Sequence, residues 1–127
     1  MVWTIDFESD EAIYIQLRNQ IIVGIAADHI REGDTLPSVR QLADNIGVNM
    51  HTVNKAYSVL KQEGFIKLDR RRGAVVAPNA DKLRAIGEMR KQLGVILARG
   101  ICKGVARQEA HALVDKIYDY YSEKCRN

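Results

Sequence analysis

Two short segments with apolar faces, joined by a single glycine, constrain the fold of this chain more than any other feature. The first begins after Ser38, which can cap a helix, and Gln41 three positions later completes a capping box. Gly47 ends it, and Asn49 can cap a second segment, which extends to about residue 63. The apolar positions at helical spacing are Val39, Leu42, Ala43 and Ile46, then Val53, Ala56, Tyr57 and Leu60. Two short helices around a tight turn with glycine predict a helix-turn-helix.

The segments on either side of this pair extend the predicted unit. A preceding helix over about residues 11–30, with Asp10 as its N-cap, is predicted by apolar side chains at helical spacing. These side chains are Tyr14, Leu17, Ile21 and Ile25. On the other side, the β-prone runs 65–68 and 74–77 flank a basic turn at residues 69–73, which predicts a hairpin. A hairpin directly after the second helix of a helix-turn-helix is a wing.

A boundary near Pro78 separates this unit from a helical tail. Apolar stripes predict two helices near residues 80–102 and 107–124, and we expect these stripes to form a core or an interface. The stripe residues expected at a dimer interface are Leu83, Ile86, Met89, Leu93, Leu97, Leu113, Ile117 and Tyr121. The sequence thus predicts a mainly α fold with a small β-hairpin. It comprises a winged helix-turn-helix over residues 1–78 and a two-helix dimerisation or effector tail over residues 79–127.

The distribution of charge along the chain is more informative than its net charge of +3. Residues 1–36 contain two basic and seven acidic side chains, whereas residues 37–76 contain seven basic and three acidic side chains. Within this basic part, the positive charge gathers in the run Arg70-Arg71-Arg72. A basic run is often only a solvated surface, so its neighbours in the fold must decide whether it binds an anionic partner.

Several classes of protein and site are excluded by what the sequence lacks. No apolar run reaches the length of about 18 residues that a membrane span needs, and no signal-peptide layout is present, so we expect a cytoplasmic protein without membrane contact. Cys102 and Cys125 are far apart, which favours two reduced thiols over a metal site. No nucleophile, base and acid set and no glycine-rich phosphate loop is present. We therefore expect no enzyme, no catalytic residue, no metal and no cofactor.

The start of the second short helix has the composition of a surface that reads DNA bases. A major groove admits one α-helix, whose N-terminal residues contact base edges. The side chains in position for such contacts are Asn49, Met50, His51, Thr52 and Asn54, most of which can donate and accept hydrogen bonds. Lys55, which follows them, can reach a phosphate. From these residues alone, a surface helix with ordinary polar exposure is the alternative.

Arginines lie on both sides of this helix in the sequence. Arg40, close to the capping Ser38, can bind guanine bidentately or clamp a phosphate, and the free N–H groups at this helix start can hold a phosphate oxygen. Alternatively, Arg40 pairs with Asp44 at i,i+4 spacing. The three adjacent wing arginines repel one another and add nothing to stability. We expect them to enter the minor groove, with Gly73 allowing close backbone approach, or else to form a solvated loop.

The residues of this unit form one nearly continuous pattern. It comprises Leu36-Pro37-Ser38-Val39-Arg40-Gln41-Leu42-Ala43, Val48-Asn49, Thr52-Val53, Lys55-Ala56-Tyr57, Leu60 and Glu63-Gly64-Phe65-Ile66. With the upstream residues Ile13-Tyr14, Gln16-Leu17, Ile21 and Gly33-Asp34, the pattern covers residues 11–77 and resembles the GntR family of bacterial regulators. The resemblance implies a winged-helix domain that binds palindromic, double-stranded operator DNA as a homodimer, with a repressor as the expected type.

The resemblance also implies which positions contact the operator. These are Arg40, residues 49–52, Asn54 and the wing tip at Arg72-Gly73. The chain departs from the family pattern at two of the expected contact sites. Met50 stands where a basic residue is common, and Arg71 stands where the wing normally has a glycine.

The tail is short for this family and resembles that of the YtrA-like subfamily. Two such helices can hardly enclose a ligand cavity of roughly several hundred Å³ within one subunit. We therefore expect their stripes to pair with a second copy, although packing against the chain's own DNA-binding domain is an alternative. The sequence identifies no small-molecule effector. As a function, a winged-helix module that binds protein or RNA is the alternative to a DNA-binding regulator.

Overall fold

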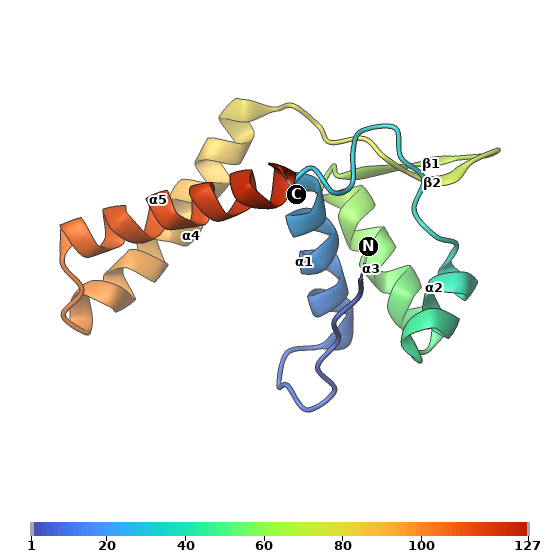
Figure 1. Ribbon diagram of the computed structural model, residues 1–127, viewed down its shortest axis with the longest axis horizontal. Helices are drawn as coiled ribbons and strands as arrows, with labels where there is room; N and C mark the ends of the chain where they lie inside the picture. Colours follow the sequence, from blue (N-terminus) through green and yellow to red (C-terminus); the bar gives the residue numbers. More distant parts are fainter. Residues whose placement is uncertain (1, 127) are drawn as a thin grey trace. The chain divides into compact units, whose positions relative to one another are not determined.

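The computed structural model describes residues 2–126, with side chains described for residues 2–123. Its elements in chain order are α1 (Ile13–Ala26), α2 (Val39–Ile46), α3 (Met50–Gln62), β1 (Ile66–Asp69), β2 (Gly73–Val76), α4 (Lys82–Cys102) and α5 (Arg107–Arg126). They belong to two compact units, Met1–Asn79 and Ala80–Asn127. In the described chain, the only sheet is one antiparallel hairpin, which follows the helix-turn-helix (Figure 1). This arrangement confirms the predicted fold class.

The ends of α2 and α3 follow from local capping interactions. The Oγ atom of Ser38 accepts a hydrogen bond from the backbone N–H of Gln41 at 3.1 Å, and the Oδ1 atom of Asn49 accepts one from the N–H of His51 at 2.7 Å. Gly47 ends α2 with a φ of 72°, in the left-handed region where a side chain would be strained. The predicted caps and turn of the helix-turn-helix are confirmed.

α1 is shorter than the predicted helix over residues 11–30 at both ends. Asp10 does not cap it, because the helix begins after Ala12, whose side chain cannot form a cap hydrogen bond. At the other end the chain turns at Asp28, which has a positive φ of 61°. Ile30 is nevertheless buried, with 7% of its surface exposed. Apolar side chains are therefore buried beyond the end of the helix. An apolar residue in this segment indicates burial, and does not by itself indicate a helical backbone.

An extended N-terminal segment is bound along α1 by two glutamine side chains. The Oε1 atom of Gln20 accepts a hydrogen bond from the N–H of Thr4 at 2.9 Å, and its amide donates to the carbonyl of Thr4. Gln16 forms the same pair of bonds with Asp6, at 2.9 and 3.0 Å. The apolar side chains that this segment packs against the core are Trp3 and Ile5. The two amides thus satisfy the backbone as a neighbouring strand would.

The wing hairpin is displaced by one residue from both predicted strands. β1 pairs with β2 so that Ile66 opposes Val76 and Asp69 opposes Gly73. The turn between the strands therefore consists of the three arginines alone, and both flanking residues take part in strand pairing. This register sets which side chains lie at the tip of the wing.

A third backbone segment pairs with the free edge of β2. The N–H of Gly33 donates to the carbonyl of Val76 at 2.7 Å, and the N–H of Val76 donates to the carbonyl of Asp34 at 2.8 Å. Further along, the N–H of Leu36 donates to the carbonyl of Ala74 at 2.8 Å. The wing is therefore joined directly to the segment that leads into α2, a contact that no sequence pattern predicted.

The core of Met1–Asn79 lies between α1, α2, α3 and the hairpin. The largest fully buried side chains are Leu17, Ile21, Leu42, Val53, Leu60 and Val76. Burial of each such side chain contributes about 1.5–3 kcal/mol. All four predicted inward positions of α3 are buried, so one side of α3 is fixed in the core and the opposite side is free to face solvent.

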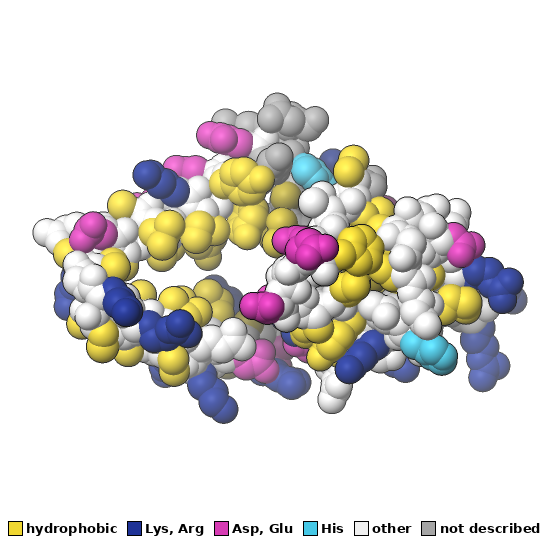
Figure 2. Space-filling model, turned by 90° about the horizontal axis from the view of Figure 1, so that it is seen from below, with side chains coloured by type: hydrophobic (Ala, Val, Ile, Leu, Met, Phe, Trp, Pro, Cys, Tyr) yellow, Lys and Arg dark blue, Asp and Glu magenta, His cyan; other side chains and the backbone are white. Residues whose placement is uncertain are grey.

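The tail unit is a pair of helices whose apolar side chains remain exposed. The turn between α4 and α5 contains Gly104, with a φ of 88°, and the N–H of Val105 bonds to the carbonyl of Gly100 at 2.9 Å. No residue of α4 is buried, and Figure 2 shows hydrophobic side chains gathered along both tail helices. Of the predicted interface residues, Leu83, Ile86, Met89, Leu93, Leu97, Leu113 and Ile117 are exposed, and Tyr121 is half-buried.

Two further expectations, about the cysteines and about membrane-spanning helices, can be compared with the structure. Cys102 is a free, exposed thiol, whereas the side chain of Cys125 lies outside the described residues. None of the helices within the described residues combines the length and the apolar character that crossing a membrane requires.

Candidate nucleic-acid interface

The N-terminal half of α3 presents a mostly polar face to solvent. Asn49, Met50, His51, Asn54 and Lys55 are exposed, and Thr52 is half-buried. Val53, Ala56, Tyr57 and Leu60 point the other way, into the core. The same helix therefore has one face held by packing and one face available to a partner, as the helical spacing of its apolar residues predicted.

Two of these side chains already have partners within the protein. The Oδ1 atom of Asn49 accepts the cap hydrogen bond from His51, so its amide N–H₂ group is the part left to donate outward. The ammonium of Lys55 lies 4.2 Å from the centroid of the Tyr14 ring, a cation–π contact with α1. The Lys55 ammonium is thus held against α1. To bind a phosphate, Lys55 must either leave the Tyr14 ring or bind the phosphate while its ammonium stays on the ring.

Arg40 is exposed in the first turn of α2, and the alternative pairing with Asp44 is not formed. Within the described residues, no ion pair involves the Arg40 guanidinium. The first turns of α2 and α3 also lack acidic residues. Both helix N-termini therefore keep the positive potential of their unpaired N–H groups, which favours an anionic partner.

A part-buried hydrogen bond joins α3 to the residue before the N-cap of α2. The hydroxyl of Tyr57, a residue with 5% of its surface exposed, donates to the carbonyl of Pro37 at 2.6 Å. Burial raises the pKa of Tyr57 well above its ordinary value. Because Pro37 immediately precedes the N-cap of α2, this bond joins α3 directly to the segment from which α2 and Arg40 begin.

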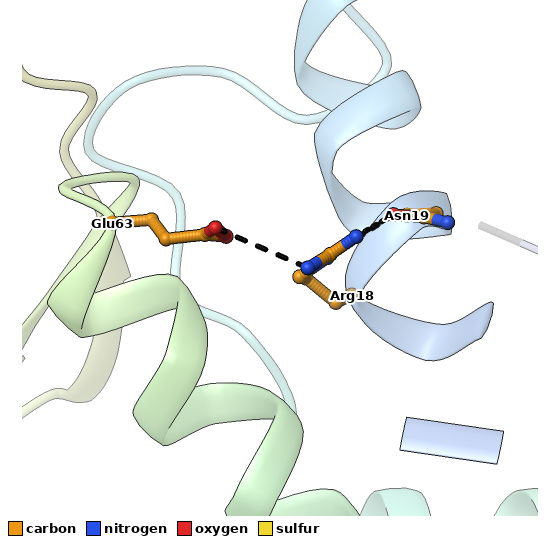
Figure 3. Close-up of polar contacts among 3 residues, drawn as sticks. All are labelled: Arg18, Asn19 and Glu63. Atoms are coloured by element: carbon orange, nitrogen blue, oxygen red, sulfur yellow. Dashed lines mark hydrogen bonds and ion pairs between the residues drawn. The ribbon is translucent and has the colours of Figure 1, made fainter. Parts of the chain in front are cut away.

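An ion pair holds the other end of α3 against α1 (Figure 3). The Nη1 atom of Arg18 lies 3.9 Å from the Oε2 atom of Glu63, and its Nη2 atom donates to the Oδ1 atom of Asn19 at 2.8 Å. The Arg18 side chain is one-quarter exposed and that of Glu63 is 41% exposed, so the pair contributes at most about 1 kcal/mol.

A carboxylate organises the turn at the wing tip. The Oδ1 atom of Asp69 accepts hydrogen bonds from the N–H groups of Arg71 at 2.8 Å and of Arg72 at 3.0 Å. These two bonds, with the nearby charge of Arg72 as a smaller cause, lower the pKa of Asp69. Gly73 follows with a φ of 80°, and a side chain placed there would meet no neighbour. Gly73 is therefore required by backbone conformation rather than by lack of space.

The three wing arginines differ in what their side chains do. The guanidinium of Arg72 donates to the carbonyl of Gly33 and to the Oγ1 atom of Thr35, the latter at 3.3 Å. The expectation that all three arginines add nothing to the structure is therefore wrong for Arg72. The reason is the pairing of β2 with residues 33–36, which places the Gly33 carbonyl within reach of Arg72.

The other two wing arginines extend into solvent. Arg70 and Arg71 are exposed, and neither side chain has a hydrogen bond or an ion pair with any described residue. Lysine and arginine side chains project where the hairpin tip lies (Figures 1 and 2). The wing thus carries positive charge that the protein itself does not neutralise.

The predicted contact residues fall into two groups in the structure. Asn54, His51, Met50 and Arg40 lie on exposed surface in the helix-turn-helix, whereas Ser38 serves as the cap of α2. Sequence reasoning did not find the residues that hold these elements in place. They are Arg18, Thr35, Pro37 and Glu63, whose partners lie 20 or more positions away in the chain.

Comparison with known proteins identifies the family of this chain. The model described as bacterial regulatory proteins of the gntR family matches residues 10–76, which include every element from α1 to β2. The chain belongs to the GntR family. The HTH-type transcriptional repressor YtrA of Bacillus subtilis is 34% identical to it over 116 residues, which cover 89% of each chain.

Solved structures extend this similarity to the fold. YtrA from Sulfolobus acidocaldarius, described as a GntR-family transcription factor, is 42% identical with a TM-score of 0.67, covering 80% of this chain and 99% of that one. A protein of Listeria monocytogenes described as a transcriptional antiterminator is 30% identical with a TM-score of 0.83, covering 98% of this chain and 93% of that one. This GntR-family protein is a transcriptional regulator of the YtrA-like type with a DNA-binding domain, and not an enzyme.

Proposed function

We propose that this GntR-family regulator is a repressor that binds a palindromic operator as a homodimer. The observation that carries the proposal is the exposed polar face of α3, which belongs to the same unit as an unpaired Arg40 and a wing with two unpaired arginines. α3 has the dimensions and the polar N-terminal face that fit a major groove. The wing arginines fit the negative potential of an adjacent minor groove.

The individual contacts follow from the chemistry of each side chain. Arg40 binds a guanine or a phosphate, and the exposed polar side chains of the first turns of α3 donate to base edges. Arg70 and Arg71 supply the wing contact, and Gly73 lets the backbone approach. Arg72 acts differently from its neighbours, because its guanidinium is already bound to the segment before α2.

The homodimer is supported by the apolar surface of the tail. The stripes on α4 and α5 are exposed in the isolated chain, and monomeric soluble proteins rarely leave contiguous apolar surface of this extent in water. A second copy buries both stripes at once through a closed two-fold interface. A two-fold dimer would place two α3 helices about 34 Å apart, in successive major grooves, so the operator is an inverted repeat.

The repressor assignment is supported by the similarity to YtrA of Bacillus subtilis, which is named a repressor and matches along nearly the whole chain. Repression by such a protein needs only occupancy of the operator. Neither the winged-helix unit nor the tail needs a catalytic group in order to repress transcription in this way.

The proposal is tested by selecting operator sequences from a randomised DNA library with the full-length protein. We expect an inverted repeat, and a binding constant whose logarithm falls with the logarithm of salt concentration at a slope near −7, if roughly eight phosphates are neutralised. Recovery of no preferred sequence, or a slope near zero, would refute the proposal.

The variant Arg40→Ala tests the proposed contact within this experiment. Losing one bidentate contact in each half-site costs roughly 2–6 kcal/mol of operator affinity for the dimer, while the exposed position leaves the fold intact. The matched control is Arg90→Ala, which removes another exposed arginine, from α4 in the other unit. Equal affinity of the two variants would show that Arg40 does not contact the operator.

A second candidate function is binding to RNA. It is favoured by one observation, the similarity to the Listeria monocytogenes protein described as a transcriptional antiterminator. Gel shifts with duplex DNA and duplex RNA of equal length and sequence distinguish the two functions. Tighter binding to the RNA duplex would favour this second candidate.

A further inference from the structure

Met50 is the one apolar side chain on the exposed face of α3. It is the first residue of the helix, and 43% of its surface is exposed. The remaining apolar residues of α3 are buried or half-buried, and the other exposed positions carry polar or charged side chains. Met50 also does not belong to the apolar side chains that pack against the core, although the nearby Val48 and Ile46 do. Stability of the folded chain therefore does not explain a methionine at this position.

Isolated apolar side chains on protein surfaces are common, so the position of Met50 matters more than its exposure. The Asn49 cap fixes the start of α3, which places Met50 in the first turn, the part of a recognition helix that faces base edges. The Tyr57–Pro37 hydrogen bond joins α3 to the segment that leads into α2. Met50 therefore belongs to the surface that meets the major groove in the proposed complex.

A thioether side chain selects a particular base by its chemistry. It carries no N–H or O–H group, so it cannot donate to the acceptors of guanine or adenine. Thymine is the base that presents an apolar group, its 5-methyl, in the major groove. Methionine is also flexible and polarisable, so it can adapt its contact to the position of a methyl group.

We propose that Met50 reads the 5-methyl group of a thymine in each half of the operator. This inference rests on the proposed function and adds a specificity-determining residue to it. The thymine lies where the first turn of α3 enters the groove, next to the bases contacted by His51 and Asn54. Discrimination is modest, because one methyl group in an apolar contact changes an equilibrium by about fourfold.

The test uses duplexes selected from a randomised library with the full-length protein. Each thymine of the selected sequence is replaced in turn by deoxyuridine, which removes only the 5-methyl group. Binding is then measured for the natural protein and for Met50→Ala. We expect one thymine per half-site whose replacement weakens binding by the natural protein about fourfold and leaves binding by Met50→Ala unchanged.

Two further variants make the result specific to apolar contact. Met50→Leu retains an apolar side chain and should retain the sensitivity to deoxyuridine. Met50→Arg should exchange the preference for thymine at that position for guanine, because arginine binds the acceptor pair of guanine. Thermal melting of each variant checks that the fold is unchanged, as expected for an exposed first-turn position.

The outcomes separate this inference from the proposed function. Selection of a defined operator in which no thymine shows residue-50-dependent sensitivity overturns the role of Met50 and leaves the regulator intact. A library that yields no preferred sequence overturns both.

Discussion

Replacing Tyr57 with phenylalanine should destabilise the fold by about 1–2 kcal/mol. The change removes only the hydroxyl that donates to the carbonyl of Pro37 at 2.6 Å, and the ring remains to fill the core. A hydrogen bond contributes about 0.5–1.5 kcal/mol net, and a buried acceptor left unpaired costs about 1–3 kcal/mol. Pro37 is half-buried, so water can partly replace the lost donor. The expected loss of unfolding free energy therefore lies in the upper part of the first range and the lower part of the second.

The effect is measured by urea unfolding of the full-length protein at fixed protein concentration, since association would otherwise shift the midpoint. The matched control is Tyr118→Phe, which removes the hydroxyl of a tyrosine with 66% of its surface exposed. We expect no change in unfolding free energy for this control. A loss for Tyr57→Phe no larger than that for Tyr118→Phe would refute the contribution assigned to the buried bond.

The same pair of proteins gives a pH test with a defined sign. Burial raises the pKa of Tyr57 in the folded state above its value of about 10 in the unfolded chain. The contribution of its protonated hydroxyl is therefore fully present below pH 10 and is lost as pH rises, because the unfolded chain ionises first. The stability difference between natural protein and Tyr57→Phe should shrink by up to about 1.4 kcal/mol per pH unit above pH 10. A difference that stays constant would contradict the burial of an un-ionised hydroxyl.

The remaining predictions concern the tail and the wing. Leu93→Glu and Leu97→Glu, each on the exposed stripe of α4, should yield monomers in sedimentation experiments. The reason is that a charge cannot be buried at the proposed interface without a partner. Dimers that persist in both variants would place the interface elsewhere. Arg72→Ala should speed hydrogen exchange of the hairpin amides, because its bonds to the segment before α2 are lost, whereas Arg71→Ala should weaken operator binding and leave exchange unchanged. Faster exchange in Arg71→Ala together with unchanged exchange in Arg72→Ala would contradict the roles given to the two arginines.

The helix-turn-helix was predictable because its boundaries are determined locally. Ser38 and Asn49 cap helices through backbone N–H groups two or three positions away, and Gly47 adopts a backbone conformation that other residues avoid. The buried side of α3 followed from the helical period for the same reason. Each of these features depends on interactions within one turn of the chain, and such interactions can be read from the sequence.

Predictions were wrong where tertiary contacts override local preference. α1 ends at Ala26 rather than near residue 30, and its start is left without the expected cap at Asp10. Ile30 is buried by the rest of the unit although it lies beyond the end of the helix. The wing arginines were expected to add nothing to stability, but the Arg72 guanidinium binds a distant carbonyl.

The sequence by itself determined the two short helices, the turn between them, the following hairpin and the face of α3 that enters the core. Tertiary structure decided which exposed side chains remain available to a partner. Lys55 is held over a ring of α1 and Arg72 is bound to the segment before α2, whereas Arg40, Arg70 and Arg71 are left unpaired. The reason is physical: a cap joins groups a few bonds apart, but these partners meet only when packing brings together segments some 40 positions apart.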